Sequence, residues 1–249
     1  MMAAAVTDDA DSKGGLRAAG RLLCIVGVLL IALALHGAWR LAGRTSPWPP
    51  RFLRRVAMIL GADIRVTGTA ERRDVMIAAN HLSWMDILLL AGTSGTRFVA
   101  KAEVAALPLV GWLAGLNRTL FVERGDRLGV GDQVATIRTA LTEGQPLAVF
   151  PEGTTGDDLH LLPFKPALFA ALMPPVPGIR VQPVRIDYGA AAGDLAWLGT
   201  DPGDAHVKRV LRRRGRFTVT LHYLAPFDPA DFPDRKAIAA EARRRIVES

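Results

Sequence analysis

Residues 74–91 read DVMIAANHLSWMDILLLA and combine an apolar segment, a polar turn and a helical pattern. The apolar segment predicts a buried strand, and the residues from Met85 onward predict the start of a helix. His81 then lies in a strand-to-helix turn, with Asp86 about one turn into the helix. Imidazole exchanges a proton near neutral pH, and a nearby carboxylate can orient it. The pattern indicates half of an acid–base site, although a purely structural histidine gives the same spacing.

Strands and helices alternate on both sides of this segment, which is typical of an α/β layer domain. Strands are expected at residues 64–67, 75–79, 97–100, 119–123, 147–150, 181–188 and 217–223. Helices are expected at residues 52–60, 103–115, 130–143 and 234–248. Residues 189–208 contain several glycines and few β-branched residues, and they predict a long loop. We therefore expect an α/β fold, with one domain at residues 61–249 and a mixed, largely parallel sheet flanked by helices.

Residues 22–39 form an almost uncharged apolar run that is just long enough for a spanning helix. It can cross a bilayer or lie embedded in one leaflet, and a cleaved signal peptide is the alternative. We expect a flexible start at residues 1–20, and a membrane-associated helical segment at residues 21–60 that includes a proline-rich linker at residues 46–50. The larger positive charge after the run places the main domain on the cytoplasmic side.

The chain has 31 lysines and arginines against 24 acidic residues, which gives a net charge of +7. Such a balance attracts phosphates on nucleic acid or on an anionic leaflet. The basic cluster at residues 208–216 has no interleaved aromatic residues for stacking on bases, so a solvated loop or a membrane surface is favoured over nucleic acid. The single cysteine, Cys24, excludes a disulfide framework, and the five histidines lack the spacing of a metal site.

A second segment, residues 149–155, reads VFPEGTT and again runs from an apolar strand into a turn. Proline and glycine bend the chain sharply, which leaves Glu152 and the threonines at a strand end, where α/β domains collect ligand-binding groups. An ordinary β-turn has the same residues. The combination with the His81 segment is more specific than either segment alone.

Together these segments resemble the glycerophospholipid acyltransferases, most closely the bacterial 1-acylglycerol-3-phosphate acyltransferases. The family's Asn-His-x4-Asp block is matched by Asn80, His81 and Asp86. Its Phe-(Ile/Val)-(Asp/Glu)-Arg, Phe-Pro-Glu-Gly-Thr and proline-containing strand blocks are matched, in order, at residues 121–124, 150–154 and 181–184. The resemblance covers roughly residues 60 to 225.

The resemblance implies direct acyl transfer without an enzyme nucleophile, a metal or a cofactor. His81 would be the general base that deprotonates a lipid hydroxyl as it attacks the thioester of acyl-CoA or acyl carrier protein. Asp86 would orient the imidazole and stabilise its cation. Arg124 would bind an anionic head group.

Four further residues complete the expected substrate site. Glu152, Gly153 and Thr154 would shape the acceptor pocket and hydrogen-bond its hydroxyls. Lys101, just past a strand end, would reach the developing oxyanion or the head group.

Two departures from the family pattern concern the acceptor. Thr155 occupies the place of an arginine that helps the family hold the substrate phosphate, and residues 164–167 read FKPA where the family has Phe-Lys-x-Gly. The form FPEGTT also resembles the branch that acylates lyso-ornithine lipid, whose head group is not a phosphate. We expect 1-acyl-sn-glycerol-3-phosphate as the acceptor, giving phosphatidic acid, with lyso-ornithine lipid as the alternative.

Two other classes remain as alternatives. A membrane thioesterase would use His81 to activate water, and a non-enzymatic basic protein would bind membranes or nucleic acid through its charge. The expected location is the bacterial inner membrane with the catalytic domain on the cytoplasmic side. The expected partners are the bilayer, the lyso-lipid and the acyl donor, with no nucleic acid.

Overall fold

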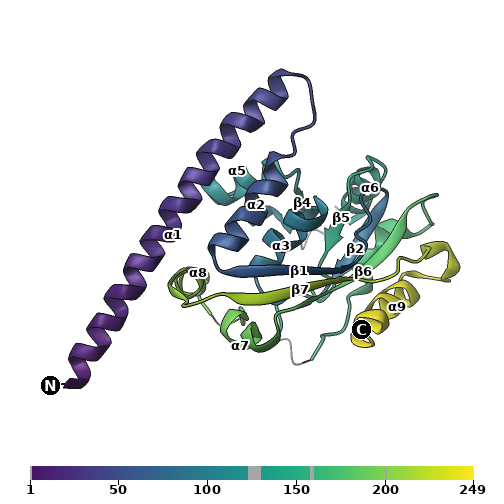
Figure 1. Cartoon of the computed structure of the whole chain (residues 1–249). Coiled ribbons are helices and arrows are strands. Elements are labelled where there is room, and N and C mark those ends of the chain that lie inside the picture. Colours follow the sequence, from purple (N-terminus) through teal and green to yellow (C-terminus); the bar gives the residue numbers. More distant parts are fainter. Residues whose placement is uncertain (1, 123–129, 158–159, 200) are drawn as a thin grey trace.

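The computed structural model describes residues 2–122, 130–157, 160–199 and 201–249. In this part of the chain the strands form one seven-stranded sheet in the order β1-β7-β6-β2-β5-β3-β4 (Figure 1). The strands are β1 (Ala62–Gly68), β2 (Val75–Ala79), β3 (Arg97–Lys101), β4 (Leu120–Val122), β5 (Leu147–Val149), β6 (Arg180–Asp187) and β7 (Phe217–Tyr223). Neighbouring strands are parallel except β6 and β7. The expected mixed, largely parallel sheet is confirmed.

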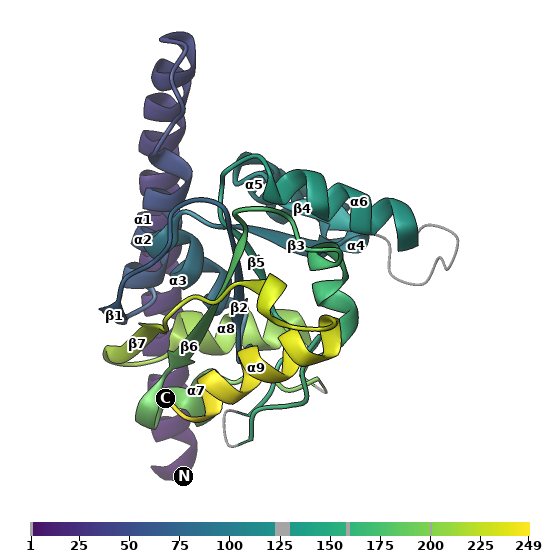
Figure 2. The same cartoon turned by 90° about the vertical axis from the view of Figure 1, so that its right-hand side faces the viewer.

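Helices surround this sheet. The α-helices are α1 (Met2–Leu41), α2 (Trp48–Ile59), α3 (Met85–Ser94), α4 (Ala102–Ala105), α5 (Pro108–Leu116), α6 (Val130–Leu141), α7 (Ala192–Leu195), α8 (Gly203–Arg212) and α9 (Arg235–Val247). Short 3₁₀ helices are η1 (Pro166–Leu172), η2 (Gly189–Ala191) and η3 (Pro229–Asp231). Two layers of helices therefore enclose the sheet, with α2 and α3 on one side and α9 on the other (Figure 2).

The central strand β2 explains this three-layer arrangement. All five of its residues are buried. Because successive side chains of a strand point to opposite faces, Ile77 packs in the core beneath α2 and α3, whereas Met76 packs in the core beneath α6 and α9. A strand that is apolar on both faces must lie inside a sheet covered on both sides.

The register of β2 with its neighbours determines where the two motif segments meet. Ala78 is opposite Val149 of β5, and Ala79 is opposite Val184 of β6, in parallel pairs. Parallel neighbours end at the same edge of a sheet. The turn after β2, which carries His81, therefore lies beside the turn after β5, which carries Glu152.

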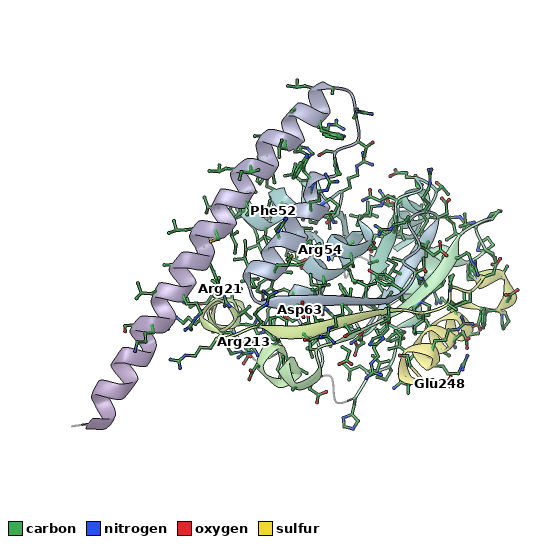
Figure 3. All side chains as sticks on the ribbon, in the orientation of Figure 1. Arg21, Phe52, Arg54, Asp63, Arg213 and Glu248 are labelled. Atoms are coloured by element: carbon green, nitrogen blue, oxygen red, sulfur yellow. The ribbon has the colours of Figure 1, made fainter. Side chains whose placement is uncertain are left out.

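Helix α1 packs along the domain with one face only. Ala18, Ile25 and Ala32 pack against the core beneath α2 and α3, and Arg21 donates to the carbonyl oxygens of Val210 and Leu211. Large apolar side chains stay exposed on the helix: Leu16, Leu22, Leu23, Val26, Leu30, Ile31, Leu35 and Leu41. Figure 3 shows α1 running along the flank of the domain, with Arg21 near Arg213.

The composition and packing of α1 support membrane association. Residues Ser12–Leu41 are long and apolar enough to cross a membrane. The domain packs against one face of this helix, and large apolar side chains on the rest of it stay exposed. The helix already begins at Met2, within the range 1–20 that was expected as a flexible start.

Several expected boundaries were wrong. The range 189–208 is not a long loop but contains η2, α7 and the first half of α8, because His206, Val210 and Leu211 give α8 a buried face. The expected helix at 103–115 is divided into α4 and α5, because Pro108 disfavours helical backbone at the preceding Leu107, which is extended. The expected linker at 46–50 ends inside α2, whose first turn accepts prolines without loss of a hydrogen bond.

Candidate active site

His81 and Asp86 meet at the carboxyl end of β2, as the sequence predicts. Nδ1 of His81 lies 2.8 Å from Oδ2 of Asp86. Since an ionised carboxylate only accepts hydrogen bonds, Nδ1 carries the proton and Nε2 keeps its lone pair. The Asp86 side chain is fully buried, whereas the His81 side chain is 18% exposed. The imidazole can therefore meet a substrate while the carboxylate behind it stays dry.

Asp86 lies in the first turn of α3, earlier in the helix than expected. Its Oδ2 also accepts the backbone N–H groups of Leu82 at 2.7 Å and Ser83 at 2.9 Å. Its Oδ1 accepts the hydroxyl of Tyr188 at 2.6 Å. These donors compensate the buried negative charge and fix the carboxylate in one position.

Asn80 and Phe150 hold the histidine from two other directions. The Asn80 amide donates to the Ile186 carbonyl at 2.9 Å and accepts the Ile186 N–H at 2.7 Å, which fastens the turn to β6. The ring of Phe150 stacks on the imidazole of His81, with centroids 3.9 Å apart and an interplanar angle of 14°. The ring of His81 is therefore oriented by a hydrogen bond at its edge and by an aromatic ring against its face.

Glu152 connects the two motif segments through the backbone. Its Oε1 accepts the N–H of His81 at 2.7 Å, and its Oε2 accepts the N–H of Leu162 at 2.9 Å. Burial raises the pKa of the Glu152 carboxyl above its ordinary value, and the two N–H groups oppose that shift. The carboxylate expected to contact acceptor hydroxyls thus holds two protein N–H groups, although it also lines a cavity beside His81.

The turn after Glu152 has a conformation that glycine favours. Gly153 has φ 73°, and a Cβ atom there would lie 2.5 Å from Nζ of Lys165. The exposed Thr154 follows. Thr155 donates its hydroxyl to the carbonyl of Trp197, whose N–H in turn donates to the Leu82 carbonyl. Thr155, which stands where the family has an arginine, therefore connects the segment after α7 to the site.

Two cavities meet at His81. One has a volume of about 180 Å³ and includes the polar side chains of Asn80, His160 and Arg185. The other has a volume of about 390 Å³ and is mainly apolar. Its apolar wall is formed by Ile87, Phe98, Val99, Val104, Phe150 and Leu168. A base between a polar and an apolar cavity can serve a molecule that has a polar head and a hydrocarbon chain.

The sequence did not point to all of these residues. Arg185 and Tyr188 lie in or just after β6, whose alternating pattern signals burial but not which face borders the site. Among the predicted residues, Lys101 ends β3, where its backbone pairs with Val122. Arg124 lies outside the residues that the structure describes.

Comparisons with known proteins identify relatives of this chain. The acyltransferase family model matches residues 63–187. A lyso-ornithine lipid O-acyltransferase of Rhodobacter capsulatus is 35% identical over 88% of this chain and 84% of its own length. A 1-acyl-sn-glycerol-3-phosphate acyltransferase of Neisseria gonorrhoeae is 28% identical over 76% and 74%.

A solved structure shares the fold. The crystal structure of the 1-acyl-sn-glycerophosphate acyltransferase from Thermotoga maritima has a TM-score of 0.65 and 24% sequence identity, over 93% of this chain and 95% of that one. The family model and the relatives together lead to one conclusion: the chain belongs to the acyltransferase family.

Proposed function

We propose that this enzyme transfers a fatty acyl group from acyl-CoA or acyl carrier protein to the free hydroxyl of a lyso-lipid, and that the acceptor is lyso-ornithine lipid. The observation that carries the proposal is the oriented His81–Asp86 pair between a polar and an apolar cavity. The relatives favour lyso-ornithine lipid over 1-acyl-sn-glycerol-3-phosphate, which the sequence had placed first.

The proposed reaction needs one base and no covalent enzyme intermediate. Nε2 of His81 accepts the proton of the acceptor hydroxyl as its oxygen attacks the thioester carbonyl carbon. The tetrahedral intermediate collapses to the ester, the carbon–sulfur bond breaks, and the leaving thiolate takes the proton from the imidazolium. Asp86 stabilises that imidazolium while it lasts.

The surroundings of Thr155 support an acceptor without a phosphate. The hydroxyl of Thr155 is used by the Trp197 carbonyl, so this position offers no cation to a phosphate. An amino-acid head group carries a carboxylate and an ammonium group instead. Arg185 lines the polar cavity, and its guanidinium has the geometry that matches a carboxylate.

The deciding experiment offers several acceptors to the same membranes. Membranes containing the protein are incubated with labelled acyl-CoA or acyl carrier protein and with lyso-ornithine lipid, lysophosphatidic acid or no acceptor. We expect label in ornithine lipid at a rate well above that in phosphatidic acid. Preferential labelling of phosphatidic acid would reverse the acceptor assignment, and donor hydrolysis without an acceptor would make the protein a thioesterase.

Arg124→Ala tests the proposed head-group contact. Since a hydrogen bond to a charged group contributes about 1.5–3 kcal/mol, we expect the KM for the acceptor to rise roughly tenfold or more. The KM for the acyl donor should change little. Steady-state kinetics with each substrate varied in turn measure both values, with Arg65→Ala on the exposed side of β1 as the control. An effect confined to the donor would assign Arg124 to the thioester side.

Glu152→Gln tests whether the carboxylate positions His81. The amide has nearly the same shape, but it presents one acceptor and an NH₂ group, so either the His81 N–H or the Leu162 N–H loses its partner. A catalytic group displaced by about 1 Å costs roughly 10²-fold, and we expect kcat to fall by about that factor. The exposed Glu248→Gln variant is the control. Unchanged kcat would show that the Glu152 charge is dispensable for positioning.

A further inference from the structure

Helix α5 carries an exposed apolar surface that the proposed chemistry does not use. Residues 104–117 contain no charged side chain. Four large side chains, which we call the α5 patch, are about half exposed: Leu107 at 51%, Leu109 at 58%, Val110 at 51% and Trp112 at 46%. Single exposed apolar residues are ordinary, whereas neighbours in one short helix and at its N-cap indicate a surface that is covered by a partner.

Other residues of α5 are packed on the protein. Leu113 and Leu116 line a small apolar cavity together with Leu29 and Leu33 of α1. A Cβ atom on Gly111 would lie 2.3 Å from the carbonyl oxygen of Ala105, so α4 and α5 approach closely there. The α5 patch is therefore held outward by a packed helix and not by a loose loop.

The position of α5 along α1 decides which partner covers the patch. Leu29 and Leu33, which face α5, belong to the middle of the apolar run at residues 22–39. Between these two residues along α1, Leu30 and Ile31 are exposed at 62% and 61%. Figure 1 shows α5 beside α1, next to α2. A leaflet that receives the exposed apolar face of α1 lies beside α5 as well.

Positive charges border this region. Arg51, Arg54 and Arg55 of α2 line a hollow together with Ile31 of α1 and Met58. Figure 3 labels Arg54 on α2, the helix that follows α1 along the chain. Apolar side chains next to arginines match hydrocarbon next to anionic lipid head groups.

We propose that the α5 patch inserts into the same leaflet as α1, as a second membrane contact of the catalytic domain. Its occupant is the hydrocarbon of a bilayer that contains anionic lipid. Val104, just before the patch, lines the apolar cavity beside His81. The contact therefore places hydrocarbon next to the cavity where an acyl chain must lie, and a lipid reaches the base without its chain crossing water.

The test locates residues of α5 in the bilayer. In a Cys24→Ser background, which removes the single cysteine, Val110→Cys is labelled with a small fluorophore. Ala240→Cys, on the exposed side of α9, is the matched control. With vesicles of phosphatidylcholine and phosphatidylglycerol, we expect the Val110→Cys label to be quenched by spin-labelled lipid and to lose most of its quenching by aqueous iodide. The Ala240→Cys label should keep its iodide quenching.

Each other outcome overturns the proposal. A Val110→Cys label that stays open to iodide means that α5 remains in water. A label protected from iodide but not quenched by the lipid means that a second protein surface covers the patch. These readouts do not depend on enzymatic activity, so they stand apart from the identity of the acceptor.

A charge on the patch gives an independent measurement. Leu109→Asp places a carboxylate at the most exposed of the four positions, and a charge in hydrocarbon is strongly disfavoured. We expect the ratio of transfer rates with vesicle-bound and micelle-dispersed acceptor to fall by about tenfold. Ala240→Asp should leave that ratio unchanged. An unchanged ratio for Leu109→Asp would contradict the insertion of α5.

Discussion

The His81→Ala variant is expected to lose roughly 10²- to 10⁴-fold in the rate of acyl transfer, which is the range that a positioned general base contributes. Nδ1 is occupied by Asp86 and the ring is stacked on Phe150, so Nε2 is the atom left for the acceptor hydroxyl. The variant should bind membranes as the wild type does, because α1 and α5 are untouched. Initial rates with labelled donor and saturating acceptor measure the effect.

A second histidine makes this test sharper. His160 also lines the polar cavity, but its side chain is exposed. His160→Ala should retain most of the activity. Equal losses in the two variants would mean that His81 is not the single base, and near-normal activity in His81→Ala would refute the mechanism. Thermal unfolding of both variants shows whether either loss reflects misfolding.

The parts of the fold that could be predicted are those with a local signal. The buried strand at residues 75–79 and the helix after it follow from apolar pattern and length. The strand at residues 217–223 was likewise placed at its observed bounds. The parallel register then brings His81 beside Glu152, which a sequence pattern alone cannot specify.

The segment after β6 shows why the rest could not be predicted. His206 is fully buried: Trp84 Nε1 donates to its Nδ1 at 2.9 Å, and its Nε2 donates to the Leu195 carbonyl at 3.0 Å. Burial is the main cause that lowers the pKa of His206, which favours the neutral ring that these two bonds require. The Trp84–His206 hydrogen bond joins residues 122 positions apart. Local composition cannot reveal such a partner, so the glycine-rich segment was predicted to be a loop.

The roles of Glu152 and Tyr188 have the same origin. A glutamate in a strand-end turn has the chemistry of a ligand-binding group, and only the fold reveals that its oxygens accept the His81 and Leu162 N–H groups. The hydroxyl of Tyr188 reaches Asp86 across 102 positions of sequence. Such partners are determined by strand order, which local patterns do not contain.

Asp86→Asn is expected to lower the transfer rate by about 10³- to 10⁴-fold with little loss of stability, in line with the loss of a triad aspartate elsewhere. The amide has the shape of the carboxylate. Its oxygen can accept the bonds that Oδ2 now accepts from His81, Leu82 and Ser83, and its NH₂ group can donate to the Tyr188 oxygen. What disappears is the negative charge that stabilises the imidazolium.

Tyr188→Phe separates that charge from the position of the carboxylate. It removes the Tyr188 hydrogen bond to Oδ1 and leaves the charge and the bonds from His81, Leu82 and Ser83 to Oδ2 intact, so we expect a loss of roughly tenfold at most. Rates and thermal unfolding are measured on both variants. If Asp86→Asn retained more activity than Tyr188→Phe, orientation of the ring would be the whole contribution of Asp86, and the charge would play no part in the transfer. The opposite order, with both proteins folded, assigns the larger effect to the buried negative charge behind His81.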